Sequence, residues 1–157
     1  MSLRILNNLS AALLAGLLVM AVSPASGDHL GRSTVADGIA VYLGIMPTEM
    51  LRAHPERYPR HESAKIPAGK NVYHVMVALF DHATGARITD ADVVATVAPL
   101  GLGAAAKPLD PTTVAGVLTY CNYFPMSAGE NYVIRARIRR PGTAEVTAEF
   151  TLLAHAD

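Results

Sequence analysis

The sequence contains a single cysteine and no tryptophan, and aromatic residues make up only 6% of it. A single cysteine excludes an internal disulfide, so the fold has to be held by its core alone. Without tryptophan and without a cysteine pair, the chain also lacks two features that mark an antibody-type domain. Cys121 has two open interpretations: a small buried apolar residue, or a thiolate that binds a metal or pairs with another chain.

An excess of charge of either sign is absent. The chain has 13 Lys and Arg residues and 13 Asp and Glu residues. A protein that binds nucleic acid or an anionic membrane surface usually carries a clear basic excess. The sequence therefore predicts no nucleic-acid partner.

Long apolar runs are absent except near the start. Residues 9–22 form an apolar run that follows Arg4, and small residues occupy 23–27. This pattern is typical of a secretory signal peptide, and the run is short for a membrane span. An uncleaved anchor is the alternative, and the lack of a following cysteine there excludes a bacterial lipoprotein. We expect a signal peptide at 1–27, a flexible mature N-terminus at 28–37 and one periplasmic domain at 38–157.

Catalytic signatures are missing as well. The sequence has no Gly-x-Ser-x-Gly, no phosphate-binding loop, no dinucleotide fingerprint and no His-Glu-x-x-His. No nucleophile can be matched with a base by spacing. The sequence therefore predicts a protein that is not an enzyme.

Period-two alternation of apolar residues is what the sequence does contain. Alternation of this kind predicts strands whose side chains point to two faces in turn. The predicted strands are 38–45, 72–80, 88–97, 113–124, 132–138 and 146–152. A helical turn with Pro47 at its first position is expected at 46–53, and 55–69 and 98–111 are predicted loops.

The stretch 71–97 carries the residues of greatest chemical interest. It is predicted to be a hairpin, with a turn at 81–87 that contains Gly85. One face of its first strand is purely apolar. The other face presents His74 and Met76, two residues apart and therefore pointing the same way.

Six strands with turn signals between them and almost no helix predict an all-β fold. The expected architecture is a single immunoglobulin-like antiparallel β-sandwich with one short helical turn after the first strand.

Imidazole and thioether ligands together favour copper, Cu(I) above all, over Mg²⁺ or Ca²⁺. His74 and Met76 share one strand face, and Met126 stands at the turn after a later strand. In a sandwich these positions can converge. The alternative is that His74 is a partly buried histidine with a backbone partner, while Met76 and Met126 fill gaps in the core.

Further ligands are available in the segment between the first two strands. Met50 and His54 lie four residues apart on the predicted helical turn, and His61 lies in the loop that follows. A different metal is also conceivable, because Asp81, Asp90 and Asp92 near one hairpin end offer oxygen ligands for Ca²⁺. Turn chemistry is the ordinary explanation of aspartates at strand ends.

A resemblance rests on residues 71–97 (NVYHVMVALFDHATGARITDADVVATV) and 120–142 (YCNYFPMSAGENYVIRARIRRPG). These segments resemble the small exported β-sandwich domains of the YtkA-like and FixH-like kind. A weaker similarity, through residues 39–50 (IAVYLGIMPTEM) and the spacing of Tyr120 to Met126, is to the Tp34-type periplasmic group that binds iron or copper. The resemblance implies a periplasmic accessory domain, with copper or iron handling in the second group.

Two hypotheses follow. The first is a non-enzymatic periplasmic metal-binding protein, with copper ahead of iron, that acts in metal uptake, delivery or resistance alongside a transporter or a periplasmic partner. Its ligands would be His74, Met76 and Met126, and Met50, His54 or His61 would complete the site from the covering loop. The second is a metal-free structural sandwich that docks a membrane or periplasmic partner through an exposed edge strand. The face of His74 discriminates between them: it is either open to the segment 54–61 or closed beneath a second sheet.

Overall fold

The computed structural model describes residues 32–53, 66–114 and 116–154. Within these ranges the chain forms eight antiparallel strands and one short helix, which confirms the predicted all-β class. The elements are β1 (Ser33–Ala36), β2 (Ile39–Pro47), α1 (Thr48–Ala53), β3 (Val72–Asp81), β4 (Asp92–Pro99), β5 (Ala106–Val114), β6 (Val117–Pro125), β7 (Asn131–Arg139) and β8 (Val146–Leu153). In the described part of the chain, no helix is long and apolar enough to cross a membrane.

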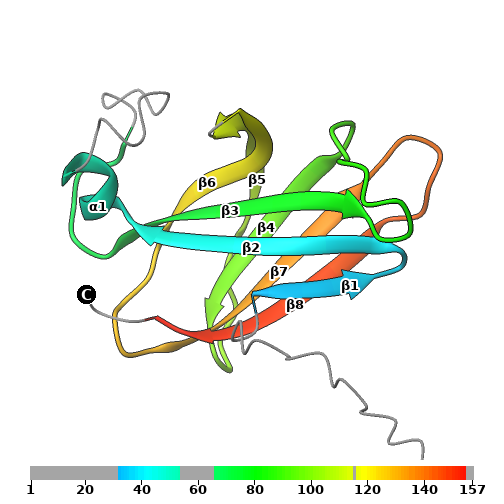
Figure 1. The fold of residues 1–157 in the computed structure, drawn as a ribbon. Helices are drawn as coiled ribbons and strands as arrows, with labels where there is room; N and C mark the ends of the chain where they lie inside the picture. Colours follow the sequence, from blue (N-terminus) through cyan, green and yellow to red (C-terminus); the bar gives the residue numbers. More distant parts are fainter. Residues whose placement is uncertain (1–31, 54–65, 115, 155–157) are drawn as a thin grey trace, which may run out of the picture.

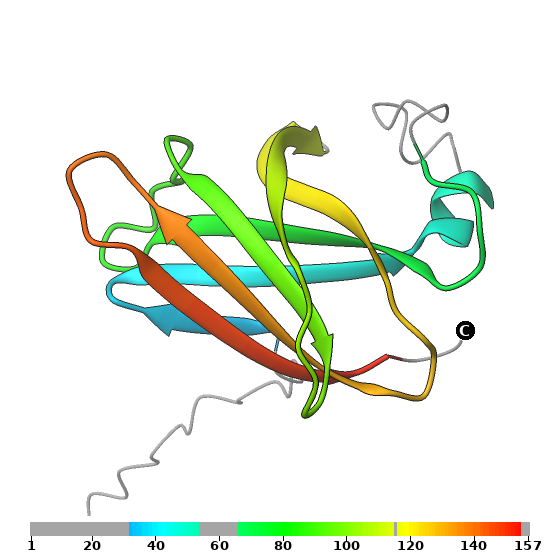
Figure 2. The ribbon, with the colours of Figure 1, turned by 180° about the vertical axis from the view of Figure 1, so that it is seen from behind.

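The strands form two packed layers that share β5. Hydrogen bonding runs in the order β1-β2-β3-β6-β5-β4-β7-β8. The first half of β5 pairs with β4 and its second half pairs with β6, so this strand passes from one layer to the other. β1 lies beside β8, which almost closes the sheet on itself (Figures 1 and 2).

The core lies between the two layers. From the first layer β2 and β3 contribute side chains such as Val41 and Val75, and from the second layer β7 contributes Ile134 and Ile138, all of them fully buried. Alternating residues of each strand point to this core, as the period-two pattern predicts.

The segment 71–97 is not the hairpin that the sequence predicted. β3 pairs with β2 and β6, while β4 pairs with β5 and β7. The intervening turn carries the chain across to the second layer, with Ile88 N–H donating to Leu79 O at 3.0 Å. Ile88 enters the core at 4% exposure. Two apolar strands joined by a turn bury as much surface on facing layers as they do when paired in one layer. The apolar pattern alone therefore does not decide whether the two strands form a hairpin.

Two strands lie where loops were expected. β1 occupies Ser33–Ala36, inside the stretch predicted to be a loose N-terminus, and β5 begins at Ala106, inside the predicted loop 98–111. β5 contains Pro108 and Pro111, which argue against a central strand from sequence alone. β5 is nevertheless paired along its length, with β4 up to Leu109 and with β6 from Asp110, so the change of neighbour falls between the two prolines. Pro47 ends β2 instead of opening the helix, which begins at Thr48.

A two-residue turn joins β1 to β2. Asp37 and Gly38 both have positive φ, 44° and 79°, as an Asp-Gly hairpin turn requires. The Gly38→Val variant should lose about 1–2 kcal/mol of unfolding free energy, because a β-branched residue is strained there. The matched control is Gly103→Val, at an exposed loop position where an added Cβ meets nothing within 4 Å. Urea denaturation measures both, and equal losses would contradict this account.

Candidate functional site

His74 and Met76 point away from the core, on the outer face of the first layer. Antiparallel register places residues of neighbouring strands side by side on this face. One row runs Gly44, Met76, Cys121, Asp110 across β2, β3, β6 and β5. The next row runs Met46, His74, Tyr123 across β2, β3 and β6.

His74 is buried although it lies on the outer face. Its side chain is 1% exposed, and its ring stacks on that of Tyr123 with centroids 4.9 Å apart and planes 30° apart. The second layer packs on the opposite face of β3, so it does not provide this burial. His74 is therefore not closed beneath the second layer, and the segment 54–61, to which its face was expected to open, lies outside the described residues.

The helix α1 lies against this end of the layer, in contact with β2 and β3. Thr48 and Leu51 are its buried residues. Arg52 donates to Thr48 Oγ1 at 3.1 Å and also to the carbonyl of Pro67, which ties the helix to the chain that leads into β3. Burial raises the pKa of Tyr123, Cys121 adds to the rise, and the charge of Arg52 opposes it.

The thiol of Cys121 is buried at 6% exposure directly opposite Met76. Burial raises its pKa, a hydrogen bond with Thr112 acts in the opposite direction, and the charge of Asp110 adds to the rise. The thiol is therefore protonated at neutral pH in the metal-free protein. Cys121 does not belong to the core cluster between the layers, which agrees with its place on the outer face.

Met76 occupies space left by a glycine. A Cβ built on Gly44 would stand 3.1 Å from Met76 Cε. The methionine side chain therefore lies over the β2 backbone, and a side chain at position 44 would have to push the end of Met76 aside. The thioether of Met76 is half-buried on the same face as His74.

Met126 is separated from this group. Its side chain is 1% exposed and belongs to the core cluster, while its N–H donates to Asn71 O at 2.9 Å. Phe124 also faces the core, and Met126 keeps its phase beyond the end of β6. The structure thus brings together His74 and Met76 but does not place Met126 beside them. Turn position alone, which suggested Met126, carries no information on the face that a residue occupies.

The remaining candidates are placed only in part. Met50 is 40% exposed on α1, and His54 and His61 lie outside the described residues. In the described part of the chain no three His, Cys, Asp or Glu side chains gather into a group that could hold a metal. That search does not include methionine, whose sulfur is a ligand for soft metal ions such as Cu(I). Sequence reasoning missed Met46 as the cross-strand neighbour of His74, since that relation depends on register.

The aspartates proposed for Ca²⁺ do not converge. Asp81 Oδ1 accepts hydrogen bonds from the N–H and hydroxyl of Thr84, which lower the pKa of Asp81. Asp90 accepts hydrogen bonds from Nε and Nη2 of Arg140, at 2.9 and 3.1 Å, and its pKa is lowered by that pair. Asp81 and Asp90 thus have a turn role and an ion-pair role, and with Asp92 they do not form a group of three ligands in the described part of the chain.

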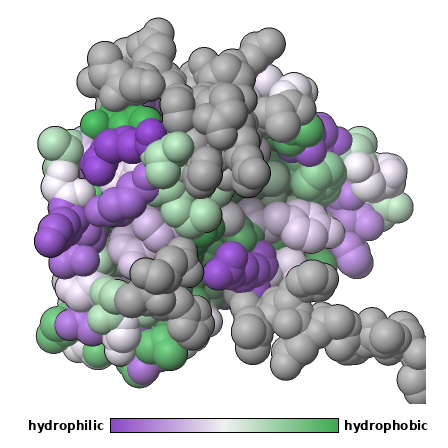
Figure 3. Space-filling view, turned by 60° about the vertical axis from the view of Figure 1, so that its left-hand side comes forward, coloured by the Kyte–Doolittle hydropathy of each residue, from purple (hydrophilic) through white to green (hydrophobic). Residues whose placement is uncertain are grey.

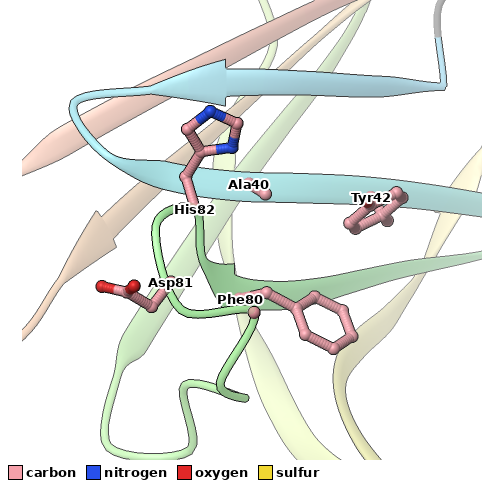
Figure 4. A pocket seen from close by; sticks show the side chains of 6 residues that line it. Ala40, Tyr42, Phe80, Asp81 and His82 are labelled. Atoms are coloured by element: carbon pink, nitrogen blue, oxygen red, sulfur yellow. The ribbon is translucent and has the colours of Figure 1, made fainter.

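The opposite end of the same outer face carries a pocket of about 470 Å³. Ala40 lies at its base, the rings of Tyr42 and Phe80 meet edge to face at 5.5 Å, and His82 stands at its rim (Figure 4). Elsewhere apolar residues are scattered among polar ones on the side that carries α1 (Figure 3).

No family model matches the chain, and no curated protein matches it. Solved structures do. A DUF4426 family protein from Pseudomonas aeruginosa has a TM-score of 0.61 and 16% identity over 81% of this chain and 96% of its own. A copper-bound variant of FetP from uropathogenic Escherichia coli has a TM-score of 0.58 and 10% identity, over 79% and 94%. FetP as isolated, expressed in the periplasm, has a TM-score of 0.57 and 14% identity, over 80% and 95%.

At these identities the likeness establishes the fold. It agrees with the resemblance to the Tp34-type group at that level, whereas the resemblance to YtkA-like and FixH-like domains stays a prediction.

Proposed function

We propose that this protein is an exported, periplasmic, non-enzymatic protein that binds a soft metal ion, with copper ahead of iron. One observation carries the proposal: His74, Met76 and Cys121 share the outer face of β3 and β6, with His74 and Cys121 buried there. Imidazole, thioether and thiol groups are all metal ligands, and here they lie on neighbouring positions of one face.

The ligand types favour Cu(I). A thioether and a thiolate are soft donors, and imidazole binds copper readily, whereas Mg²⁺ and Ca²⁺ prefer oxygen. Met76 and Cys121 are direct cross-strand neighbours, and His74 is one step along the same face of β3. These residues would hold the ion, and binding would release the Cys121 proton.

The surroundings support a site that is completed from the α1 side. Met46 lies beside His74 in register, and α1 leads into the segment that contains His54 and His61. These two histidines and Met50 remain proposed ligands. The copper-bound state of FetP, a protein of the same fold, is consistent with copper here, and its periplasmic expression is consistent with an exported protein.

A metal-free module that docks a membrane or periplasmic partner is the second candidate. The observation in its favour is the aromatic pocket between Tyr42 and Phe80, because Tyr42 is 50% exposed there. Exposed aromatic side chains at a concave surface are typical of contact sites.

Titration of the exported protein with Cu(I), against a competing chelator, tests the proposal. We expect one ion per chain. The Cys121→Ser and Met76→Leu variants should each bind at least about tenfold more weakly, because each removes one soft donor. His82→Ala is the matched control, since His82 is exposed at the far end of the same face, and it should bind as the wild type does. If the protein does not bind Cu(I) in a one-to-one ratio, the metal-binding proposal fails and the metal-free docking module becomes the preferred function.

A further inference from the structure

The connection between β4 and β5 carries only apolar side chains. Residues 97–106 read VAPLGLGAAA, without a charged or hydrogen-bonding side chain. Residues 100–106, the apolar tip, are all exposed, and Leu100 and Leu102 are 60% and 67% exposed. A run of exposed apolar residues is unusual in a loop unless the loop binds something. Figures 1 and 2 show this loop projecting beyond the lower ends of the strands.

A turn at the start of the tip holds the two leucines close together. Leu102 N–H donates to Pro99 O at 2.9 Å, and Gly101 within this turn has a φ of 83°. A Cβ built on Gly101 or Gly103 would meet nothing within 4 Å. The tip therefore stands clear of the two layers.

A third exposed leucine lies at the base of the tip. Leu100 N–H donates to Asn131 O at 2.8 Å, and Asn131 is the register partner of Leu153 on β8. Leu153 is 43% exposed. The ends of β4, β7 and β8 thus bring exposed apolar residues to one end of the second layer.

Two residues of opposite charge, Lys107 and Glu130, flank the tip, and both make contacts within the chain. Lys107 Nζ donates to Tyr123 O at 2.8 Å and lies 5.2 Å from the centroid of the Phe124 ring. Glu130 Oε2 accepts a hydrogen bond from the Tyr132 hydroxyl at 3.1 Å. One charge of each sign gives the tip no net charge with which to attract a charged partner.

Size and composition argue against a protein as the occupant of the tip. A stable protein interface takes roughly 20–30 residues from each side and draws its strongest contacts from Tyr, Trp and Arg. The tip consists of residues 100–106 alone, all of them Leu, Gly or Ala, and alanine is depleted in such interfaces. A lipid surface needs no complementary shape and takes up leucine side chains readily.

We propose that the apolar tip inserts into the surface of a phospholipid bilayer and holds the protein there. Leu100 and Leu102 enter the boundary between headgroups and acyl chains, where headgroups and water can still bind the backbone polar groups of the tip. Leu153 adds apolar surface beside them. The binding is reversible, because a few leucines bury less apolar surface than one fatty acyl chain. It needs no anionic lipid, is not weakened by salt and does not depend on metal binding.

Flotation with vesicles tests the insertion. Vesicles of pure phosphatidylcholine, and of phosphatidylcholine with an equal amount of phosphatidylglycerol, should carry the exported protein equally well, and added NaCl should not release it. The double variant Leu100→Ser with Leu102→Ser should bind at least about tenfold more weakly. The matched control, Val35→Ser with Val117→Ser, removes side chains that are 50% and 37% exposed on β1 and β6, and it should bind as the wild type does. Equal binding by the two double variants, or binding to the anionic vesicles alone, overturns the proposal.

A fluorescent reporter observes the tip itself. The chain contains no tryptophan, so Leu102→Trp places a single indole on the tip, and Tyr42→Trp places one at an exposed position of β2. Phosphatidylcholine vesicles should shift the emission of Leu102→Trp to shorter wavelength and leave that of Tyr42→Trp unchanged, and lipids with brominated acyl chains should quench only the first. An unshifted Leu102→Trp spectrum overturns the proposal. A shift that appears when the protein is concentrated without lipid also overturns it, in favour of a second copy of the chain.

Discussion

Truncation of Met126 to alanine is expected to lower the free energy of unfolding by about 2–5 kcal/mol, whereas Met126→Leu should lose less than about 1.5 kcal/mol. The side chain is 1% exposed and belongs to the core cluster between the layers. Alanine leaves a cavity at this position, while leucine conserves the volume. Chemical denaturation with a two-state fit measures both values.

Met50→Ala is the control for the loss of a methionine, because Met50 is 40% exposed on α1 and should change stability by no more than about 0.5 kcal/mol. The copper affinity of Met126→Leu should equal that of the wild type, since the residue lies on the core face. A tenfold weaker affinity in Met126→Leu would instead place its sulfur among the ligands.

The faces of the strands could be predicted from the sequence because they depend on local alternation. Tyr73 and Val75 were expected on one face of β3 and His74 and Met76 on the other, and the structure has them so. The period of two is a property of any extended strand and does not depend on which strands are its neighbours. For the same reason the all-β class could be predicted.

Strand pairing could not be predicted, because it depends on contacts between residues far apart in the chain. The expected hairpin at 71–97 proved to be a crossing between layers, and β6, which follows after two intervening strands, is the neighbour of β3. That pairing sets Cys121 opposite Met76 and Tyr123 opposite His74. The candidate site is therefore a product of register, and single-residue motifs could indicate only its ligand types.

Burial of His74 also had no signal in the sequence. An outer-face residue is expected to meet solvent, yet Tyr123 stacks on the ring and α1 lies against the same end of the layer. The helix reaches that place because β2 extends to Pro47 before the chain turns at Thr48. The sequence predicted that the helix begins at residue 46, two residues before Thr48, and so did not predict that the helix lies near His74.

Replacement of His74 by phenylalanine is expected to reduce Cu(I) affinity by at least about 100-fold while the fold is retained. Phenylalanine keeps a ring of similar size for stacking on Tyr123 but offers no nitrogen to a metal. Loss of a group near a metal centre costs 10–100-fold even when it does not touch the ion, so removal of a direct ligand should cost at least the upper value. Competition with a Cu(I) chelator measures the affinity.

Stability must be measured on the same variant, because the polar contacts of His74 are lost with its nitrogens. We expect His74→Phe to lower the free energy of unfolding by about 1–3 kcal/mol, the usual cost when a buried partner is left unsatisfied. Tyr123→Phe serves as the matched control: it preserves the stacked pair, alters no nitrogen or sulfur, and should bind copper as the wild type does. A folded His74→Phe protein with unchanged affinity would remove His74 from the site and leave the stacked pair as packing. Loss of affinity in His74→Phe but not in Tyr123→Phe would show that the imidazole nitrogen, and not the packing around it, holds the ion.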